Sequence, residues 1–170
     1  MSDIAIRPLT DDDAEPFKVL RLKAIQDAPT AIWPTHDEES GRTLEETRNR
    51  IRTTDHQIVF GAFAEAELIG IAGLRREALA QVAHKAVLWG VFVDPAHRRA
   101  GIAGRLLNAA IAHARAARVL QIHLCVNAEN PRAQALYRNA GFETFGIERR
   151  AMRVSNRFYD EEHMALRLDA

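Results

Sequence analysis

Residues 91–107 carry two glycines and several arginines directly after an apolar run. The run Val91-Phe92-Val93 breaks at Asp94-Pro95, and a helical pattern begins near Gly101 and Gly104. A strand therefore leads into the first turn of a helix, where backbone N–H groups lack intrahelical acceptors and lie at the positive end of the helix dipole. This arrangement suits a pyrophosphate, because glycine lets phosphate oxygens approach the backbone without an intervening Cβ.

A second segment, residues 126–142, reads VNAENPRAQALYRNAGF. Asn130-Pro131 provides a helix N-cap followed by proline at the first helical position, and Gly141 suits the C′ position. Asn130 could cap this helix or contact a ligand. Asn127, at the end of the preceding alternating run, is a weaker candidate for ligand contact.

Both segments resemble one family. Residues 98–103, RRAGIA, are similar to the Arg/Gln-x-x-Gly-x-Gly/Ala signature of the GNAT superfamily of acyl-CoA-dependent N-acetyltransferases. Residues 126–142 are similar to that family's Asn-x-x-Ala-x-x-Leu-Tyr-x-x-x-Gly-Phe run. The resemblance implies acetyl-CoA as co-substrate and these contact residues for it: Val91, Phe92, Val93, Arg98, Arg99, Ala100, Gly101, Ile102, Ala103, Gly104, Arg105, Asn127, Asn130, Ala133 and Tyr137.

The hydrophobic periodicity predicts the element order β-α-α-β-β-β-α-β-α-β-β. Asp27 to Gly41 is expected to be irregular, and the part from Arg149 to Asn156 suggests a final hairpin. The order matches the GNAT fold, an α/β (α+β) architecture with a mixed, mostly antiparallel central sheet flanked by helices. By resemblance, strands 87–93 and 120–127 splay apart, and pantetheine bonds to main-chain groups of the first at Val91 and Val93.

Length, composition and charge limit the domain number, the location and the partners of the protein. The length and 47% apolar content predict one domain over residues 1–170. No signal peptide and no run of eighteen apolar residues is found, so we expect a cytoplasmic protein, either monomer or homodimer. The formal net charge of zero gives no support for nucleic acid or membrane as partner. Arg98, Arg99 and Arg105 lie in a stretch without acidic residues that could steer a polyanion such as coenzyme A.

Acyl transfer from a thioester to an amine needs a neutral amine, a polarised carbonyl and a proton for the thiolate. Tyr137 occupies the family's general-acid position, and a phenol with a pKa of about 10 is protonated at neutral pH. No carboxylate lies in residues 87–93, where many members have a glutamate. Glu38 is therefore the candidate base, with Glu39 and His36 as alternatives in the same loop.

The single cysteine, Cys125, excludes an intrachain disulfide, and it could form an acyl-enzyme with His123 as base. We expect instead a small residue packed in the sheet, because the family transfers the acetyl group directly. Paired-histidine metal spacing is absent, so no metal is expected.

The predicted acceptor is the primary amine of a small molecule. Residues 10–46 carry ten acidic and four basic side chains, which favours a cationic acceptor such as an amino acid, polyamine or drug-like amine. Trp33, His36 and Tyr159 could line its pocket. Two alternatives stay open: a protein N-terminal or lysine acetyltransferase, and a catalytically silent acyl-CoA-binding regulatory module.

Overall fold

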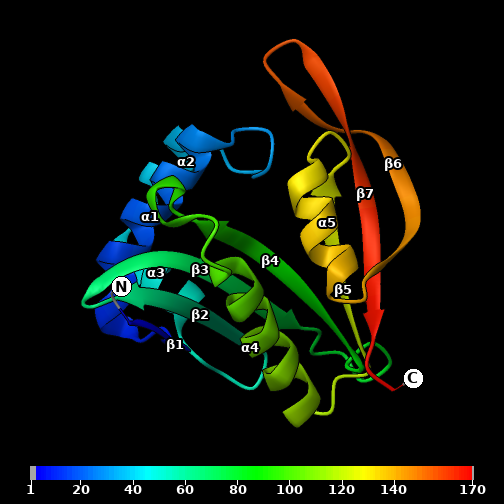
Figure 1. Cartoon of the computed structure of the whole chain (residues 1–170), viewed down its shortest axis with the longest axis horizontal. Helices are drawn as coiled ribbons and strands as arrows, with labels where there is room; N and C mark the ends of the chain where they lie inside the picture. The colour runs from blue at the N-terminus through cyan, green and yellow to red at the C-terminus, as the bar shows by residue number, and fades with distance from the viewer. Residues whose placement is uncertain (1–2, 170) are drawn as a thin grey trace.

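The computed structural model describes residues 3–169 and contains one seven-stranded sheet (Figure 1). Its strand order is β1-β2-β3-β4-β5-β7-β6, and every neighbouring pair is antiparallel except β4 and β5. The strands are β1 Ile4–Pro8, β2 Gln57–Ala64, β3 Glu67–Arg76, β4 Lys85–Val93, β5 Gln121–Asn127, β6 Glu143–Val154 and β7 Arg157–Arg167. The mixed, mostly antiparallel sheet expected from the sequence is confirmed.

The parallel pair β4 and β5 is joined only at its beginning. Lys85–Val87 pair with Gln121–His123, and beyond these residues the two strands separate (Figure 1). Main-chain groups on the β5 side of β4 from Leu88 onward therefore have no strand partner in this direction. The splayed central strands expected from the sequence are confirmed, and the gap between them is where an extended ligand could complete the sheet.

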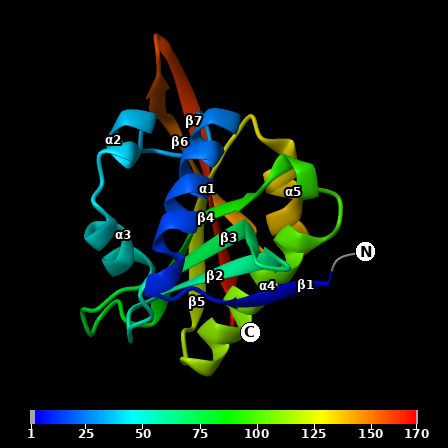
Figure 2. The ribbon, with the colours of Figure 1, turned by 90° about the vertical axis from the view of Figure 1, so that its left-hand side faces the viewer.

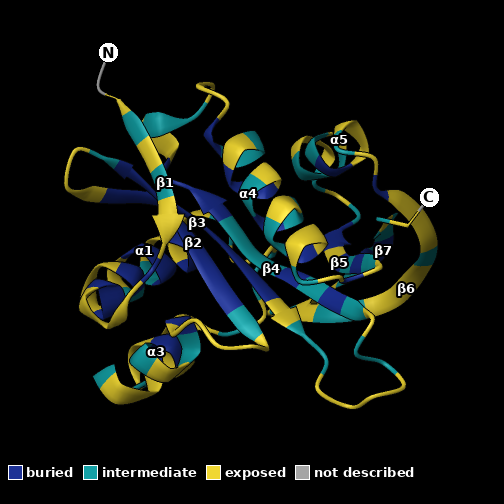
Figure 3. Ribbon diagram, turned by 90° about the horizontal axis from the view of Figure 1, so that it is seen from below, coloured by how far each residue is buried: buried dark blue, intermediate teal, exposed yellow. Residues whose placement is uncertain are grey.

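Helices cover both faces of the sheet (Figures 2 and 3). The helices are α1 Ala14–Asp27, α2 His36–Ser40, α3 Leu44–Ile51, α4 Ile102–Ala116 and α5 Pro131–Asn139, with short 3-10 turns η1 Asp11–Asp13 and η2 Pro95–His97. On one face, Phe17 and Leu20 of α1 pack with Ile51 of α3. On the other, α4 buries Leu106 and Leu107, and Tyr137 of α5 joins the same core. Each face is thus stabilised by its own apolar cluster.

Threonine capping boxes begin the N-terminal helical segments. Thr35 and Thr43 accept hydrogen bonds from the backbone N–H of Glu38 and Glu46, whose carboxylates accept in return from the two threonine N–H groups. The first of these boxes forms α2, so the expectation that Asp27 to Gly41 is irregular throughout was wrong at its C-terminal part. The sequence pattern missed α2 because the helix has only five residues.

The C-terminal hairpin is longer than the sequence predicts. Its turn lies at Ser155–Asn156, inside the expected range, but strands β6 and β7 extend from Glu143 to Arg167. The pairing shifts register between Glu148 and Met152, where Arg150 has φ +55°, and this irregularity interrupts the alternation along the sequence. Within residues 3–169 no helix is both long and apolar enough to cross a membrane.

Candidate active site

A cavity of about 830 Å³ lies between the diverging ends of β4 and β5 and reaches the start of α4 and one side of α5. The two motif segments meet here. Of the expected contact residues, these line the cavity: Val91, Phe92, Val93, Arg98, Arg99, Gly101, Ile102, Ala103, Gly104, Asn127, Asn130, Ala133 and Tyr137. Ala100 and Arg105 are not among the lining residues, because Ala100 is exposed at the turn and Arg105 donates to the carbonyl of Ile4 at 2.7 Å.

The N-terminus of α4 fits a pyrophosphate. Its N-cap residue is Gly101, in the left-handed region at φ +71°, and no side chain caps the helix. The first N–H groups of α4 are therefore not taken up by a side-chain acceptor, and they face a cavity that Gly101 and Gly104 line. A Cβ placed on either glycine meets no protein atom within 4 Å, so these two positions leave space beside the backbone.

The arginines around this turn have different roles. Arg98 forms an ion pair with Asp27 at 2.7 Å and donates from Nε to the carbonyl of Val93 at 3.1 Å. Its charge is thus largely compensated within the protein. Arg99 is exposed and adopts φ +67°, and Arg132, which the sequence analysis did not single out, also lines the cavity. These two side chains are better placed than Arg98 or Arg105 to attract phosphate charge.

A β-bulge in β4 lies at the centre of the gap. Ile71 pairs with Phe92 and Gly73 with Trp89, so Gly90 and Val91 together oppose the single residue Ala72. Gly90 adopts φ +67°, a conformation that glycine takes without the penalty of a side chain. The bulge turns main-chain groups of β4 toward the cavity, where a thioester carbonyl could accept a hydrogen bond from a backbone N–H.

Tyr137 lies in the cavity wall across from β4. The residue is 8% exposed, and its ring packs against the α4 side of the core. Burial raises the pKa of its phenol to about 12. Tyr137 is therefore protonated at neutral pH and can serve as a hydrogen-bond donor to a group in the cavity.

A second cavity, of about 780 Å³, adjoins the first. The two share lining residues from β4, β5 and the loop after α1, including Gly90, Cys125 and Asn127. Trp33 lines the second cavity, as the sequence analysis expected for an acceptor pocket. His36 and Tyr159 are not among its lining residues: His36 is exposed at the start of α2, and Tyr159 accepts a hydrogen bond from Arg157 at 3.3 Å.

Two carboxylates line the second cavity. Glu38 accepts from the Thr35 backbone at 2.8 Å, and this bond lowers the pKa of its carboxyl group, which makes it a weaker base. Glu161 on β7 is 5% exposed, and its Oε1 accepts from the Trp33 indole at 2.8 Å. Its Oε2 is buried without a hydrogen-bond partner. Glu161 was not predicted from the sequence, because nothing along the chain shows that this carboxylate is buried in the cavity wall.

The asparagines hold the site together. Asn130 caps α5, as predicted, by accepting from the Ala133 N–H at 3.2 Å. Asn127 is 5% exposed, donates to the carbonyl of Thr30 at 2.9 Å and accepts from the Glu129 N–H at 2.8 Å. Its amide thus anchors the loop after α1 that lines both cavities, so its side chain is already engaged within the protein.

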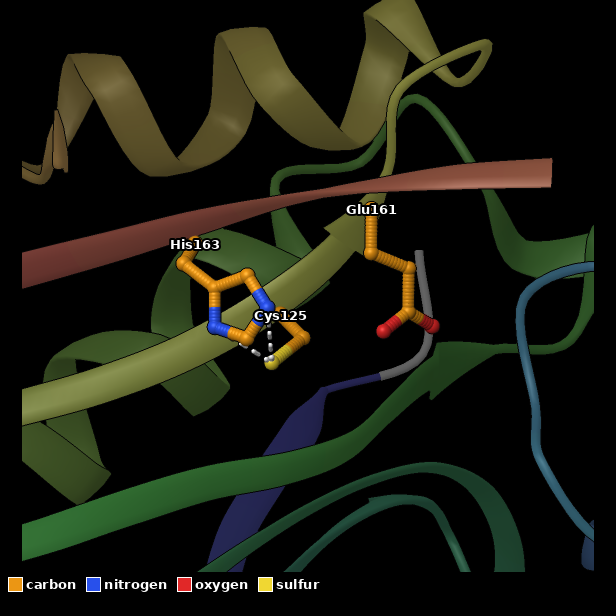
Figure 4. A group of neighbouring side chains, drawn as sticks. All are labelled: Cys125, Glu161 and His163. Atoms are coloured by element: carbon orange, nitrogen blue, oxygen red, sulfur yellow. Dashed lines mark hydrogen bonds between the residues drawn. The ribbon is translucent and has the colours of Figure 1, made fainter. Parts of the chain in front are cut away.

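Cys125 is exposed, so the expectation of a residue packed in the sheet was wrong. Its thiol points toward β7 rather than toward His123. Figure 4 shows its thiol beside His163 and Glu161, with the Cys125 Sγ to His163 Nδ1 distance 3.3 Å. One ligand atom from each of these three residues lies within 4.8 Å of the others, a spacing that could hold a metal ion. The absence of paired-histidine spacing in the sequence predicts no metal, but residues that pair across β5 and β7 leave no such spacing along the chain. Burial and the nearby Glu161 and Glu148 raise the pKa of the thiol to about 11.

The arginines Arg21 and Arg50 line the floor of the second cavity, and Arg21 is buried. Arg21 is 2% exposed, and burial together with the neighbouring Arg50 lowers the pKa of its guanidinium to about 10. Arg50 donates to the buried carboxylate of Glu39 at 3.0 Å. Both arginines lie over the ring of Trp89, at 5.8 Å and 4.7 Å from its centroid.

Together the splayed strands, the uncapped helix start and the buried phenol form a site that could hold an extended, phosphorylated ligand. Residues 22–142 match the model of the acetyltransferase (GNAT) family. The chain belongs to this family.

Known proteins agree with this assignment. Over 107 residues the chain is 36% identical to the N-alpha-acetyltransferase RimI of Mycobacterium tuberculosis, a match that covers 63% of this chain and only 65% of that protein. A GNAT-family acetyltransferase of Streptococcus pneumoniae has a TM-score of 0.90 at 23% identity, covering 98% of this chain and all of that one. A putative acetyltransferase of Salmonella typhimurium, solved with acetyl-CoA, has a TM-score of 0.85 at 20% identity, with 99% and 96% covered. The two structures establish the shared fold.

Proposed function

We propose that the protein transfers the acetyl group of acetyl-CoA directly to a primary amine of a small molecule in a ternary complex. The observation that carries this proposal is the second cavity, which adjoins the coenzyme cavity and has a floor of buried side chains. A small molecule can enter such a cavity whole, with its amine at the residues that the two cavities share. The proposed reaction consumes acetyl-CoA, so we expect the protein to act in the cytoplasm, where acetyl-CoA is supplied.

The pantetheine arm would lie along the unpaired edge of β4, with the pyrophosphate on the first N–H groups of α4. The thioester carbonyl then lies near the bulge at Gly90 and Val91, where a backbone N–H stabilises the developing oxyanion. Holding both reactants in adjoining cavities replaces a bimolecular encounter by an oriented one.

Glu161 is the best-placed base for the acceptor. An amine enters mostly as its ammonium form and must lose a proton before it can attack. The unpartnered Oε2 of Glu161 is available to take that proton, while Oε1 is held by the Trp33 indole. The lowered pKa of Glu38 makes that residue the weaker candidate.

The chemical step forms a bond from the amine nitrogen to the carbonyl carbon and breaks the bond from carbon to sulfur. The second amine proton leaves to solvent. Tyr137 donates a hydrogen bond to the departing sulfur; its phenol, with a pKa of about 12, is a weaker acid than a thiol, so stabilisation of the thiolate precedes its protonation.

The similarity to RimI favours one rival, a protein N-terminus as acceptor. Thiol release from acetyl-CoA should be measured with a panel of small primary amines and with short peptides that have free N-termini. We expect turnover with small amines at kcat/KM values well above those of every peptide. Turnover with peptides alone would replace the small-molecule proposal, and tight acetyl-CoA binding without turnover of either class would support the silent module.

A further inference from the structure

Three arginines at the acceptor cavity share one buried carboxylate. The Glu39 side chain is 3% exposed and lies 3.0 Å from Arg50, 3.7 Å from Arg21 and 3.6 Å from Arg42. All three arginines line the cavity, and Glu39 does not. The single charge of Glu39 cannot compensate all three arginines, and it is the arginines that line the cavity.

The hydrogen-bonding capacity of these guanidinium groups is not exhausted either. The Nε atoms of Arg21 and Arg42 face Glu39 at 3.7 and 3.6 Å, too long for hydrogen bonds, so Glu39 compensates these two guanidinium groups only weakly. Buried polar groups in folded proteins are nearly always bonded, and an under-compensated buried cation is costly. A guanidinium group presents its donors in a planar fork that matches a carboxylate in two parallel bonds. The NH1 atom of Arg21 lies beside Gly90 in the cavity wall, where a ligand carboxylate could meet it.

The arginines are also held in position. The guanidinium groups of Arg21 and Arg50 lie over the ring of Trp89. The indole itself lies across Gly73, where an added Cβ would come within 2.2 Å of it. A Cβ on Gly90 would lie 3.3 Å from NH1 of Arg21. The Arg21 guanidinium thus sits directly against the bulge at which the acetyl group is transferred, so the anion it binds must be only a few bonds from the reacting amine.

We infer that the acceptor carries a carboxylate close to its amine, and that Arg21 and Arg50 bind that carboxylate at the floor of the cavity. The ligand class is the amino acids and compounds like them. The inference rests on the proposed transfer to a small-molecule amine and narrows its substrate class. Glu161 on β7 complements the carboxylate site at Arg21 and Arg50. A zwitterionic amino acid would present its ammonium group to the glutamate and its carboxylate to the arginines.

The acidic composition of residues 10–46 indicated a cationic acceptor. Among the side chains that line the cavity, however, basic ones outnumber acidic ones. Arg21, Arg42, Arg50 and Arg75 are set against Glu38 and Glu161. Most acids of the N-terminal region, such as Asp12 and Asp37, are exposed instead. A purely cationic acceptor such as a polyamine would meet repulsion at the cavity floor.

The test uses matched pairs of probes: the proteinogenic L-amino acids and the corresponding α-amides, which keep the amine and side chain but lack the carboxylate. Binding to the protein saturated with coenzyme A should be measured by calorimetry, and acetyl transfer by thiol release. We expect at least one amino acid to bind about 10-fold or more tightly than its amide, the scale for losing a charge-assisted bond. Equal affinity within every pair, or no binding by any amino acid, would overturn the inference.

Variants separate recognition from architecture. Arg50→Met should abolish the preference for carboxylate over amide, while Arg48→Met, on the same helix but outside the cavity lining, should retain it. Arg50→Lys keeps the charge beside Glu39 and loses the planar fork, so it should retain a reduced preference. If Arg50→Met lowers the melting temperature but leaves the preference intact, the arginines only tie α1, α2 and α3 together and the inference fails.

The same data distinguish failure of the two proposals. Amides that are acetylated as fast as amino acids would leave the small-molecule transfer standing and remove only the carboxylate site. Amino acids that bind in a carboxylate-dependent manner without any thiol release would remove the proposed transfer and leave the site.

Discussion

The ring of Tyr137 meets the ring of Phe142 edge-on, with centroids 5.9 Å apart and an interplanar angle of 64°. Phe142 is 2% exposed and follows the end of α5, so the contact fixes the tyrosine ring independently of its hydroxyl group. The hydroxyl can therefore be removed without releasing the ring. This separation makes Tyr137 the most direct residue at which to test the chemistry.

Tyr137→Phe should lower kcat roughly 10²-fold, the scale for losing one preorganised donor at the leaving group, and leave acetyl-CoA affinity nearly unchanged. The retained contact with Phe142 should keep the melting temperature within a few degrees. Single-turnover rates and thermal melts on one preparation check both. A loss of less than about threefold, with chemistry rate-limiting, would assign Tyr137 to packing alone.

The pH dependence of kcat follows from the same residue. Burial raises the phenol pKa to about 12, so the protonated, donating form persists above the pH at which an ordinary phenol ionises. We expect Tyr137 to cause no fall in kcat below about pH 10. The profiles of the parent and of Tyr137→Phe should run parallel up to that pH. An alkaline fall near pH 9 that disappears in the variant would contradict the raised pKa.

Glu161→Gln should lower kcat/KM by about 10²-fold or more, because the amide cannot take the ammonium proton. The variant keeps an oxygen that can accept from the Trp33 indole, so the cavity wall is preserved. Trp33→Phe is the matched control for loss of that hydrogen bond. The variant should be assayed at a pH where the acceptor is mostly an ammonium and at a pH where it is mostly a neutral amine. Full activity of Glu161→Gln at both pH values would mean that another group removes the proton.

Local sequence determined much of this site, and tertiary packing determined the rest. The start of α4 and the cap at Asn130 depend on a few consecutive residues, so their motifs predict them. Glu161, Arg21 and Arg50 converge from β7, α1 and α3, and no spacing along the chain connects them. The charge that faces the acceptor cavity was misjudged for the same reason. A count of acidic and basic residues in 10–46 does not say which of these side chains face the cavity.

Gly104→Ala should separate coenzyme binding from stability. Alanine is favoured over glycine inside a helix by about 1 kcal/mol, and an added Cβ meets no protein atom within 4 Å, so the melting temperature should stay or rise. Acetyl-CoA affinity should fall, because the methyl group occupies space beside the helix start. Gly146→Ala, on β6 and equally free of contacts, is the matched control and should bind coenzyme A like the parent. Unchanged affinity in Gly104→Ala would move the pyrophosphate away from this turn.

Cys125 tests whether transfer is direct. Its Sγ lies 3.3 Å from His163 Nδ1, and His163 Nε2 lies 2.9 Å from Glu148, an order of groups that could serve a nucleophilic thiol. Burial and two nearby glutamates raise the thiol pKa to about 11, so very little thiolate exists at neutral pH. Cys125→Ala should therefore keep kcat within about threefold. Because Cys125 is the only cysteine, an acetyl thioester found by mass spectrometry of the parent without acceptor, sensitive to hydroxylamine and absent from the variant, would establish a covalent route instead.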